Sequence, residues 1–346
     1  REPAQVVGDG KHTISDLVEL ENKNPLRGDG HATALTKIRF DDIALAHLAS
    51  NGLSPEYVPK TGERVLLRNN ANLSTGGSAT DVTDEVRGDR NVPGITDVGR
   101  QIEGNINTRF SYGTYDTWLS RLMGAAWASD VLVNGVSHLA GTLEQFYEQG
   151  GTDSFVRFQA CRWNTLELNL EARRAVTAQW GIMGIRSPTP TSAIISGATY
   201  TAATTSEEFN AGLNVANLAL SGVTNSPKMM SLKLSVTNKI YANDIVSSYE
   251  TYSHGLGRFE VSGSMNTYFE NLDTYAAIVG HDTVGLSFDL EDAAGNSYTF
   301  ELPKIKLMDG GPAAPGNGKA VMLEVPFQAF FDATTGGTLK ITRDAA

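Results

Sequence analysis

The chain of 346 residues carries 39 acidic and 28 basic side chains, a net charge of −11, which excludes a protein that holds nucleic acid through clustered Lys and Arg. Its 40% apolar and 19% charged residues are typical of a globular protein, and no apolar run is long enough for a transmembrane helix. The single cysteine excludes an internal disulfide framework, and the absence of a signal-peptide pattern predicts synthesis in a reducing cytoplasm.

The first 57 residues predict an N-terminal arm. Residues 36–50 contain an imperfect helical stripe of apolar side chains, whereas the rest of the segment is polar and glycine-containing. We expect this arm to be partly helical and unable to fold alone. A short apolar strand is predicted at 64–67, and the polar, glycine-rich stretch 69–96 is too long for a tight turn.

The segment 99–110, GRQIEGNINTRF, predicts a half-buried strand. Apolar or small residues at 102, 104, 106, 108 and 110 alternate with polar residues at the odd positions, and successive side chains of a strand point to opposite faces. Residues 114–127 predict a helix with Thr114 as its N-cap. Further strands are predicted at 155–161, 165–170 and 175–185.

The second half of the chain repeats this order after a linker. Residues 187–206 are rich in Pro, Thr, Ser and Ala, a composition typical of linkers. The pattern then predicts a helix at 271–280 between strands. The strands are predicted at 228–241, 257–269, 286–290, 298–302, 319–331 and 338–342.

An internal repeat indicates a duplicated domain. Residues of the first predicted strand recur 159 positions later with the apolar face preserved, and the helix recurs as well. The matches are Gly104 with Gly263, Asn107 with Asn266, Phe110 with Phe269, and Asp116-Thr117-Trp118 with Asp273-Thr274-Tyr275. Chance similarity between two amphipathic strands does not account for the helix. The predicted division is an arm at 1–57, a first module at 58–201 that includes the linker 187–201, and a second module at 202–346.

No arrangement typical of a catalytic or metal site occurs in the sequence. The six histidines have neither i,i+4 spacing nor an HExxH frame. The glycine-rich segment 310–319 ends in Gly318-Lys319 but continues with Ala320, so it fails as a phosphate loop. Cys161 lies in an apolar strand pattern and is expected in the core. We predict no enzyme, no metal and no cofactor.

Several segments carry a family resemblance: 72–74 with 84–90, 104–110 with 115–119, 158–161 with 180–184, and 209–210 with 234–238. Together they resemble the tail tube proteins of long, non-contractile-tailed bacteriophages. The resemblance is distributed over residues 57–346, and residues 1–56 depart from it.

The resemblance implies a mainly β fold with two tandem β-sandwich or barrel-like modules, each with one flanking α-helix, plus the arm. It implies a structural virion protein whose rings, three chains with pseudo-six-fold symmetry, stack into a tail tube for DNA ejection. The implied partners are other copies of the chain, the tape measure, tail terminator and distal tail proteins, and phage DNA in transient contact, with no membrane. A baseplate, distal tail or capsid-decorating protein is the alternative, and a β-sandwich binding module or enzyme is less favoured.

The two repeated strands supply the candidate site. Their apolar faces are expected to pack on each module's helix, through Trp118 and Leu122 in the first module and Tyr275 and Ile278 in the second. Their polar faces then point away from the core and, in a tube built from such sheets, line the channel. The predicted luminal residues are Gln101, Glu103, Asn105 and Asn107, with Glu260, Ser262, Ser264 and Asn266 as their counterparts. Short polar and acidic side chains offer DNA no cationic anchor.

Overall fold

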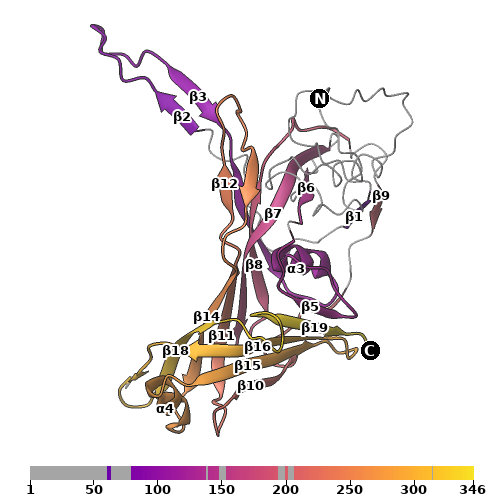
Figure 1. The fold of residues 1–346 in the computed structure, drawn as a ribbon, viewed down its shortest axis with the longest axis vertical. Helices are drawn as coiled ribbons and strands as arrows, with labels where there is room; N and C mark the ends of the chain where they lie inside the picture. Colours follow the sequence, from indigo (N-terminus) through magenta and orange to yellow (C-terminus); the bar gives the residue numbers. More distant parts are fainter. Residues whose placement is uncertain are drawn as a thin grey trace, which may run out of the picture.

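The computed structural model describes residues 61–63, 79–137, 139–147, 153–193, 199–201, 206–313 and 315–346. The predicted arm at 1–57 and the strand predicted at 64–67 lie outside these residues. The fold is mainly β, as the sequence predicts (Figure 1). None of the helices in the described ranges is long and apolar enough to cross a membrane.

The first half of the chain contributes nine strands and one helix to the described structure. They are β1 (Thr61–Glu63), β2 (Ala79–Val82), β3 (Ile95–Gly99), β4 (Ile102–Arg109), α3 (Asp116–Met123), β5 (Val131–Val133), β6 (Gly141–Tyr147), β7 (Ser154–Glu171), β8 (Thr177–Gly184) and β9 (Thr199–Thr201). The strands predicted at 155–161 and 165–170 form one long strand, β7. A register shift against β8 between Trp163 and Thr165 marks the interruption that made the sequence look like two strands.

The second half contributes ten strands and one helix. They are β10 (Val215–Ser221), β11 (Met229–Thr237), β12 (Tyr241–Asn243), β13 (Ser253–Gly255), β14 (Glu260–Tyr268), α4 (Asp273–Val279), β15 (Thr283–Glu291), β16 (Ser297–Leu307), β17 (Pro312–Ala313), β18 (Met322–Ala329) and β19 (Lys340–Asp344). Asp292 closes the tight turn between β15 and β16, because its carboxylate accepts hydrogen bonds from the backbone N–H groups of Ala294 and Asn296 at 2.9 Å each.

Most strands belong to a single sheet with the order β10-β15-β16-β18-β14-β11-β7-β8-β4. The neighbours of β4 and β14 are arranged alike: β4-β8-β7 with β6 beside β7, and β14-β18-β16 with β15 beside β16. Strand β11 lies between the two groups and hydrogen-bonds to β7 on one edge and β14 on the other. The two halves therefore share one continuous sheet.

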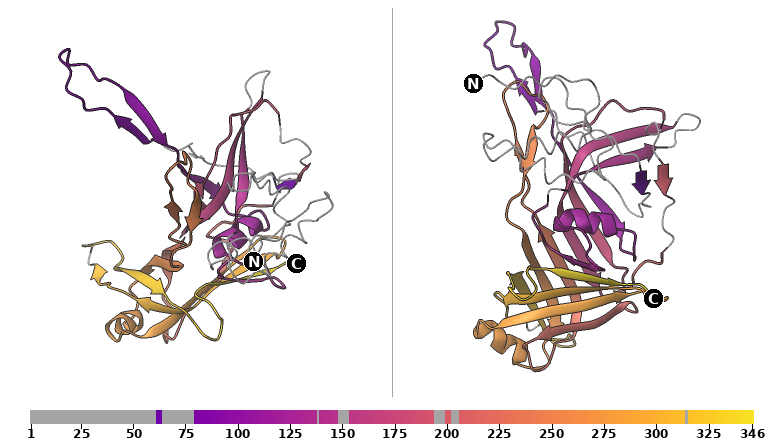
Figure 2. Two further views of the ribbon diagram at one scale, coloured as in Figure 1. Left: turned by 45° about the horizontal axis from the view of Figure 1, so that its top comes forward. Right: turned by 45° about the vertical axis from the view of Figure 1, so that its right-hand side comes forward.

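The sheet folds over itself into two layers. In Figures 1 and 2, β10, β15, β16 and β19 run across β14, β11, β7 and β8. Strand β16 belongs to both layers, since residues 305–307 pair with β18 while residues 297–301 pair with β19. An aromatic core lies where the layers and the two halves meet, with the Phe110 ring 5.7 Å from Tyr298 and 6.0 Å from Phe209.

Helix α3 packs on the sheet, whereas α4 is less covered. Trp118 and Leu122 are 7% and 1% exposed, and the Trp118 ring lies 5.3 Å from that of Trp180. The expected N-cap at Thr114 is wrong: the helix begins at Asp116, Tyr115 precedes it, and no side chain caps its first turn.

The expectation that Tyr275 packs in the core is also wrong. Tyr275 is 36% exposed, and α4 turns Thr274 and Ala277 inward, with Ile278 partly buried against the core. The two helices begin at Asp116 and Asp273, so Tyr275 stands at the position of Trp118, but α4 presents a different side to the sheet than α3 does.

Two hairpins, β2–β3 and β12–β13, project from the same end of the subunit (Figure 1). The stretch predicted as a long polar loop at 69–96 is therefore partly a β-hairpin. The two hairpins touch where the Tyr249 hydroxyl donates to the Asp97 carboxylate and Arg100 lies over the Tyr249 ring at 5.3 Å. Both expose apolar side chains, including Val86, Ile95 and Val246.

The base of β12–β13 contains a buried histidine. His254 is 4% exposed, neither ring nitrogen has a hydrogen-bond partner, and its carbonyl accepts from Arg162 Nη1 at 3.3 Å. Burial, followed by the Arg162 charge, lowers the pKa of the imidazole to about 4, with Asp244 acting weakly in the opposite direction. The folded protein therefore holds this side chain neutral.

This burial predicts a loss of stability in mild acid. The unfolded chain takes up a proton at His254 near pH 6.5 and the folded chain near pH 4, so the stabilisation present above pH 6.5 is lost as the pH falls towards 4. Between pH 6.5 and 5 the free energy of unfolding should fall by about 1–2 kcal/mol. Denaturant unfolding at several pH values measures this. A His254→Leu variant should lack this part of the decline, and identical pH profiles for both chains would contradict the assignment.

Candidate functional site

The candidate site is the solvent-facing side of the sheet formed by β4, β8, β7, β11, β14 and β18, here called the polar face. Directly paired residues of neighbouring strands point to the same side. One unbroken row crosses all six strands. Its members, in strand order, are Asn107, Gln179, Glu167, Ser235, Ser262 and Gln328.

The opposite side of the same strands is the core. The adjacent row consists of large apolar side chains that are at most 4% exposed: Ile106, Trp180, Leu166, Val236 and Val261. Because the pleat places these rows on opposite sides, burial of the apolar row fixes the orientation of the polar row.

Seven of the eight predicted luminal residues lie on β4 and β14, and Gln101 directly precedes β4. On β4, Asn105 lies opposite Gly181 and Asn107 opposite Gln179. Gly181 leaves space at this point, since a Cβ there would lie 2.1 Å from Thr165 Oγ1. Glu103 accepts a hydrogen bond from Gln101 Nε2 at 2.7 Å. Three strands, β11, β7 and β8, lie between β14 and β4, so the polar side chains of β4 and β14 share a face without being neighbours.

The residues from β14 are more enclosed than those from β4. Glu260 pairs with Arg258 and lies 3.3 Å from Lys239 Nζ, and these contacts lower the pKa of its carboxyl group, Arg258 contributing most. Ser262 and Ser264 lie in register with Ser235 and Lys233. The amide oxygen of Asn266 is buried and has no hydrogen-bond partner.

The polar face carries more acid than base. Its carboxylates are Glu103, Glu167, Glu171, Glu260 and Glu324, as the strand pairings place them. Lys233 on β11 is neutralised by Glu167 at 2.9 Å, and Arg109 at the end of β4 by Glu208 at 2.7 Å. Glu171 also pairs with Arg174 and Glu260 with Arg258 and Lys239, so much of the charge on this face is neutralised by ion pairs.

Sequence reasoning missed the contribution of the central strands. Gln179, Glu167 and Ser235 lie between the two predicted groups and complete the row. The signal was present as strict alternation in 166–171, LELNLE, and in 232–237, LKLSVT. It was not used because these strands lack the repeated motif.

A second unpredicted cluster joins the two halves of the chain. The buried Tyr298 hydroxyl on β16 donates to Asp116 at the start of α3 and accepts from the Gly113 N–H at 2.8 Å. Arg343 on β19 binds Asp116 at 2.5 Å and Asp130 at 2.7 Å, and it lies over the Trp127 ring at 4.7 Å. Burial, and then the Asp116 charge, raise the pKa of Tyr298 well above its usual value. Its hydroxyl therefore stays protonated and able to donate.

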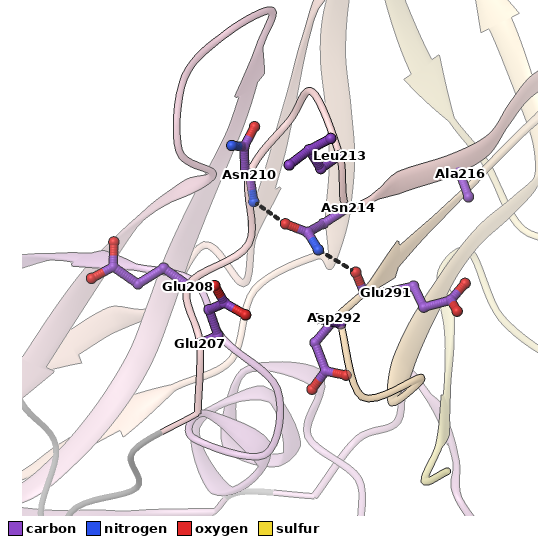
Figure 3. Close-up of a pocket in the computed structure, with 9 residues that line it drawn as sticks. Glu207, Glu208, Asn210, Leu213, Asn214, Ala216, Glu291 and Asp292 are labelled. Atoms are coloured by element: carbon purple, nitrogen blue, oxygen red, sulfur yellow. Dashed lines mark hydrogen bonds between the residues drawn. The ribbon is translucent and has the colours of Figure 1, made fainter.

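An acidic hollow of about 440 Å³ lies beside the start of β10, and Figure 3 shows the residues that line it. Glu207, Glu208 and Asp292 line it, and the Asn214 side chain bridges its walls by accepting from the Asn210 N–H and donating to the Glu291 carbonyl. Within the described ranges, no group of three His, Cys, Asp or Glu side chains is placed to hold a metal ion.

The sequence matches the family described as phage tail tube protein over residues 53–329. The chain belongs to this family. The match includes all six strands of the polar face. It identifies the protein as a structural component of the virion tail. The mainly β fold with one large sheet agrees with that identity.

A shorter similarity links the chain to enzymes. A stretch of 86 residues is 49% identical to the glutathione biosynthesis bifunctional protein GshAB of Clostridium perfringens and 49% identical to the cyanophycin synthetase of Crocosphaera subtropica. It covers 25% of this chain and 11% and 10% of those proteins. The chain thus spans about a tenth of the length of the curated relatives it matches. Because only residues 1–52 and 330–346 lie outside the tube-family match, the stretch shares residues with it.

The cluster between the halves predicts a measurable stabilisation. A Tyr298→Phe variant keeps the ring in the aromatic core but removes the hydrogen bonds to Asp116 and Gly113, so the free energy of unfolding should fall by about 1–3 kcal/mol. Denaturant unfolding of the purified chain measures the change. Tyr268→Phe, at a position 40% exposed, is the matched control and should have little effect. Equal losses in the two variants would contradict the role of the cluster.

Proposed function

We propose that three copies of this chain close into a ring, that rings stack into the tail tube, and that the polar face lines the channel through which DNA is ejected. The observation that carries the proposal is the polar row that crosses six strands from both halves without a break. A curved wall with a buried face and an acidic, solvent-facing face suits a conduit that DNA must leave again.

The proposed subunit has an arm at 1–57, a module at 58–201 and a module at 202–346. The recurring strand order around β4 and β14 supports two modules of related fold. Three chains with two modules each would give six similar units around the axis. Among the described strands, β4 pairs only with β8 and β10 only with β15, and unpaired edges favour association with another chain.

The projecting hairpins are suited to contacts along the tube axis. β2–β3 and β12–β13 extend from one end and expose Val86 and Val246 almost completely. Clustered exposed apolar side chains are typical of interaction sites. We assign them to the adjacent ring, and the tube ends to tape measure, tail terminator and distal tail proteins.

The chain is proposed to have no catalytic activity of its own. The similarity to synthetases covers about a tenth of those enzymes, and tube formation needs no reaction. Assays of the purified chain for glutathione or cyanophycin synthesis should give no product, and turnover would overturn this part of the proposal. A baseplate, distal tail or capsid-decorating role is the competing structural function.

Electron microscopy of the purified protein tests the assembly. The proposal predicts rings with six similar lobes built from three chains, and hollow tubes at higher concentration. Protein that stays monomeric at high concentration under all salt conditions would contradict it. Single rings that never stack, or flat lattices, would favour the competing structural roles.

Charge reversal on the polar face tests the channel. Glu103→Lys places a cation on an exposed position of β4, so assembly should persist while duplex DNA is retained in the tubes at low salt. Each additional phosphate contact should steepen the fall of log K with log salt by about 0.9. DNA retention by purified tubes across a salt series measures the effect.

Matched controls separate the channel from the rest of the surface. Glu103→Gln removes the negative charge without adding a cation, and Glu207→Lys makes the same reversal in the acidic hollow, outside the six strands of the polar face. Both should leave DNA passing freely. Equal retention by the Glu103→Lys and Glu207→Lys variants would contradict the assignment of the polar face to the channel.

A further inference from the structure

The β12–β13 hairpin, residues 241–255, is not part of the main sheet. Its two strands pair with each other as a separate two-stranded sheet, which projects from one end of the subunit (Figure 1). An isolated two-stranded hairpin is marginally stable in water. Its position therefore depends on the contacts that hold it against the rest of the chain.

Polar contacts attach this hairpin to the first half of the chain. With the hairpin residue first, they include Glu250 with Arg186 Nε at 3.7 Å, the Tyr249 carbonyl with the Arg100 N–H at 3.0 Å, and the His254 carbonyl with Arg162 Nη1 at 3.3 Å. The ion pair is exposed, and exposed ion pairs contribute little to stability. The contact at His254 is the buried one.

The imidazole of His254 is enclosed where the hairpin meets β7. It is 4% exposed, and neither ring nitrogen has a hydrogen-bond partner among the described residues. The charged groups that act on it are Arg162 of β7 and, more weakly and with the opposite sign, Asp244 beside β12. Burial lowers the pKa of Arg162 only to about 10, so this guanidinium keeps its charge. A proton on His254 would add a second positive charge beside the first without solvation, which is costly.

Release of the hairpin removes this cost. In water the imidazole has its ordinary pKa of 6.5, whereas burial and then the Arg162 charge lower the pKa to about 4 in the docked hairpin. The docked position is therefore favoured above pH 6.5, and this preference is lost as the pH falls towards 4. Between pH 7 and pH 4.5 the ratio of released to docked hairpin should rise by about 50-fold.

We propose that His254 makes the β12–β13 hairpin an acid-sensitive element, docked on β7 at neutral pH and released in mild acid. The docked hairpin exposes Tyr241, Ile245 and Val246, and the proposed function gives this hairpin to the adjacent ring, so release also loosens ring stacking. Only this effect on stacking rests on the proposed function, because release is a property of the single chain.

Distances between two spin labels test the release. Labels at Val246→Cys in the hairpin and Arg173→Cys in the turn after β7 occupy exposed positions. Native Cys161 is buried, and burial raises the pKa of its thiol to about 12, so it should stay unlabelled. The full chain should give one narrow distance at pH 7 and a second, broad distribution at pH 4.5 that disappears on return to pH 7. An unchanged narrow distance at pH 4.5 would overturn the proposal.

Variants at His254 identify the group that responds. His254→Leu keeps the backbone contact to Arg162 but takes up no proton, so its distance should stay narrow at both pH values. His254→Gln is neutral and polar, and it should behave in the same way if the leucine variant fails to fold. A broad distribution at pH 4.5 in these variants would overturn the role of His254.

Matched controls remove other groups that titrate in acid. Glu250→Gln removes the exposed ion pair of the hairpin, and His281→Asn removes an exposed histidine outside it. Both should keep the response to acid. Loss of the response in Glu250→Gln, together with its persistence in His254→Leu, would assign the release to the ion pair and overturn the proposal.

Electron microscopy at the two pH values separates release from stacking. Tubes of the native chain should come apart into rings at pH 4.5, and tubes of His254→Leu should persist. Tubes that persist while the labels report release would contradict the assignment of the hairpin to the adjacent ring and leave the release standing. Labels that report no release would overturn the inference whatever the state of the tubes.

Discussion

Strand β11 is hydrogen-bonded along both edges, to β7 of the first half and to β14 of the second. Because of this double pairing, the alternation of buried and exposed side chains is in register between the two halves. Val236 lies beside both Leu166 and Val261 in the core, so Ser235 must lie beside both Glu167 and Ser262 on the polar face. A shift of one residue at either edge would expose a row of buried side chains to solvent and interrupt the polar face. The continuous wall depends on this register.

The two halves share a strand order but differ where they meet other elements. In the first half, Asp116 is held by Tyr298 and Arg343 in a partly buried polar cluster. In the second half, α4 also begins with an aspartate, Asp273, which accepts a hydrogen bond from Asn225 Nδ2 at 2.6 Å, and Leu272 and Val279 of this region are exposed. A buried carboxylate without a partner lowers the stability of the folded chain. The partners of Asp116 therefore belong to the same chain.

The sequence predicted β4 and β14 closely, because strict alternation and the repeated motif reinforce each other there. It also predicted one polar face on each. It did not predict that β7 is a single strand, because the bulge near Thr165 breaks the alternation locally. The side of α4 was assigned wrongly because the shared Asp-Thr-aromatic start places Tyr275 at the position of Trp118, whereas α4 buries Thr274 and Ala277 instead. The contacts of Tyr298 join residues 182 positions apart, and no local pattern reports such a pair.

A structure of the assembled tube by electron cryo-microscopy tests the central claim most directly, because it shows which side of the continuous sheet faces the axis. The account predicts that Glu103, Asn107 and Ser262 line the channel of every ring, with Trp180 and Val236 buried in the wall. It would be contradicted by a tube in which these polar side chains lie on the outer surface or are buried between subunits.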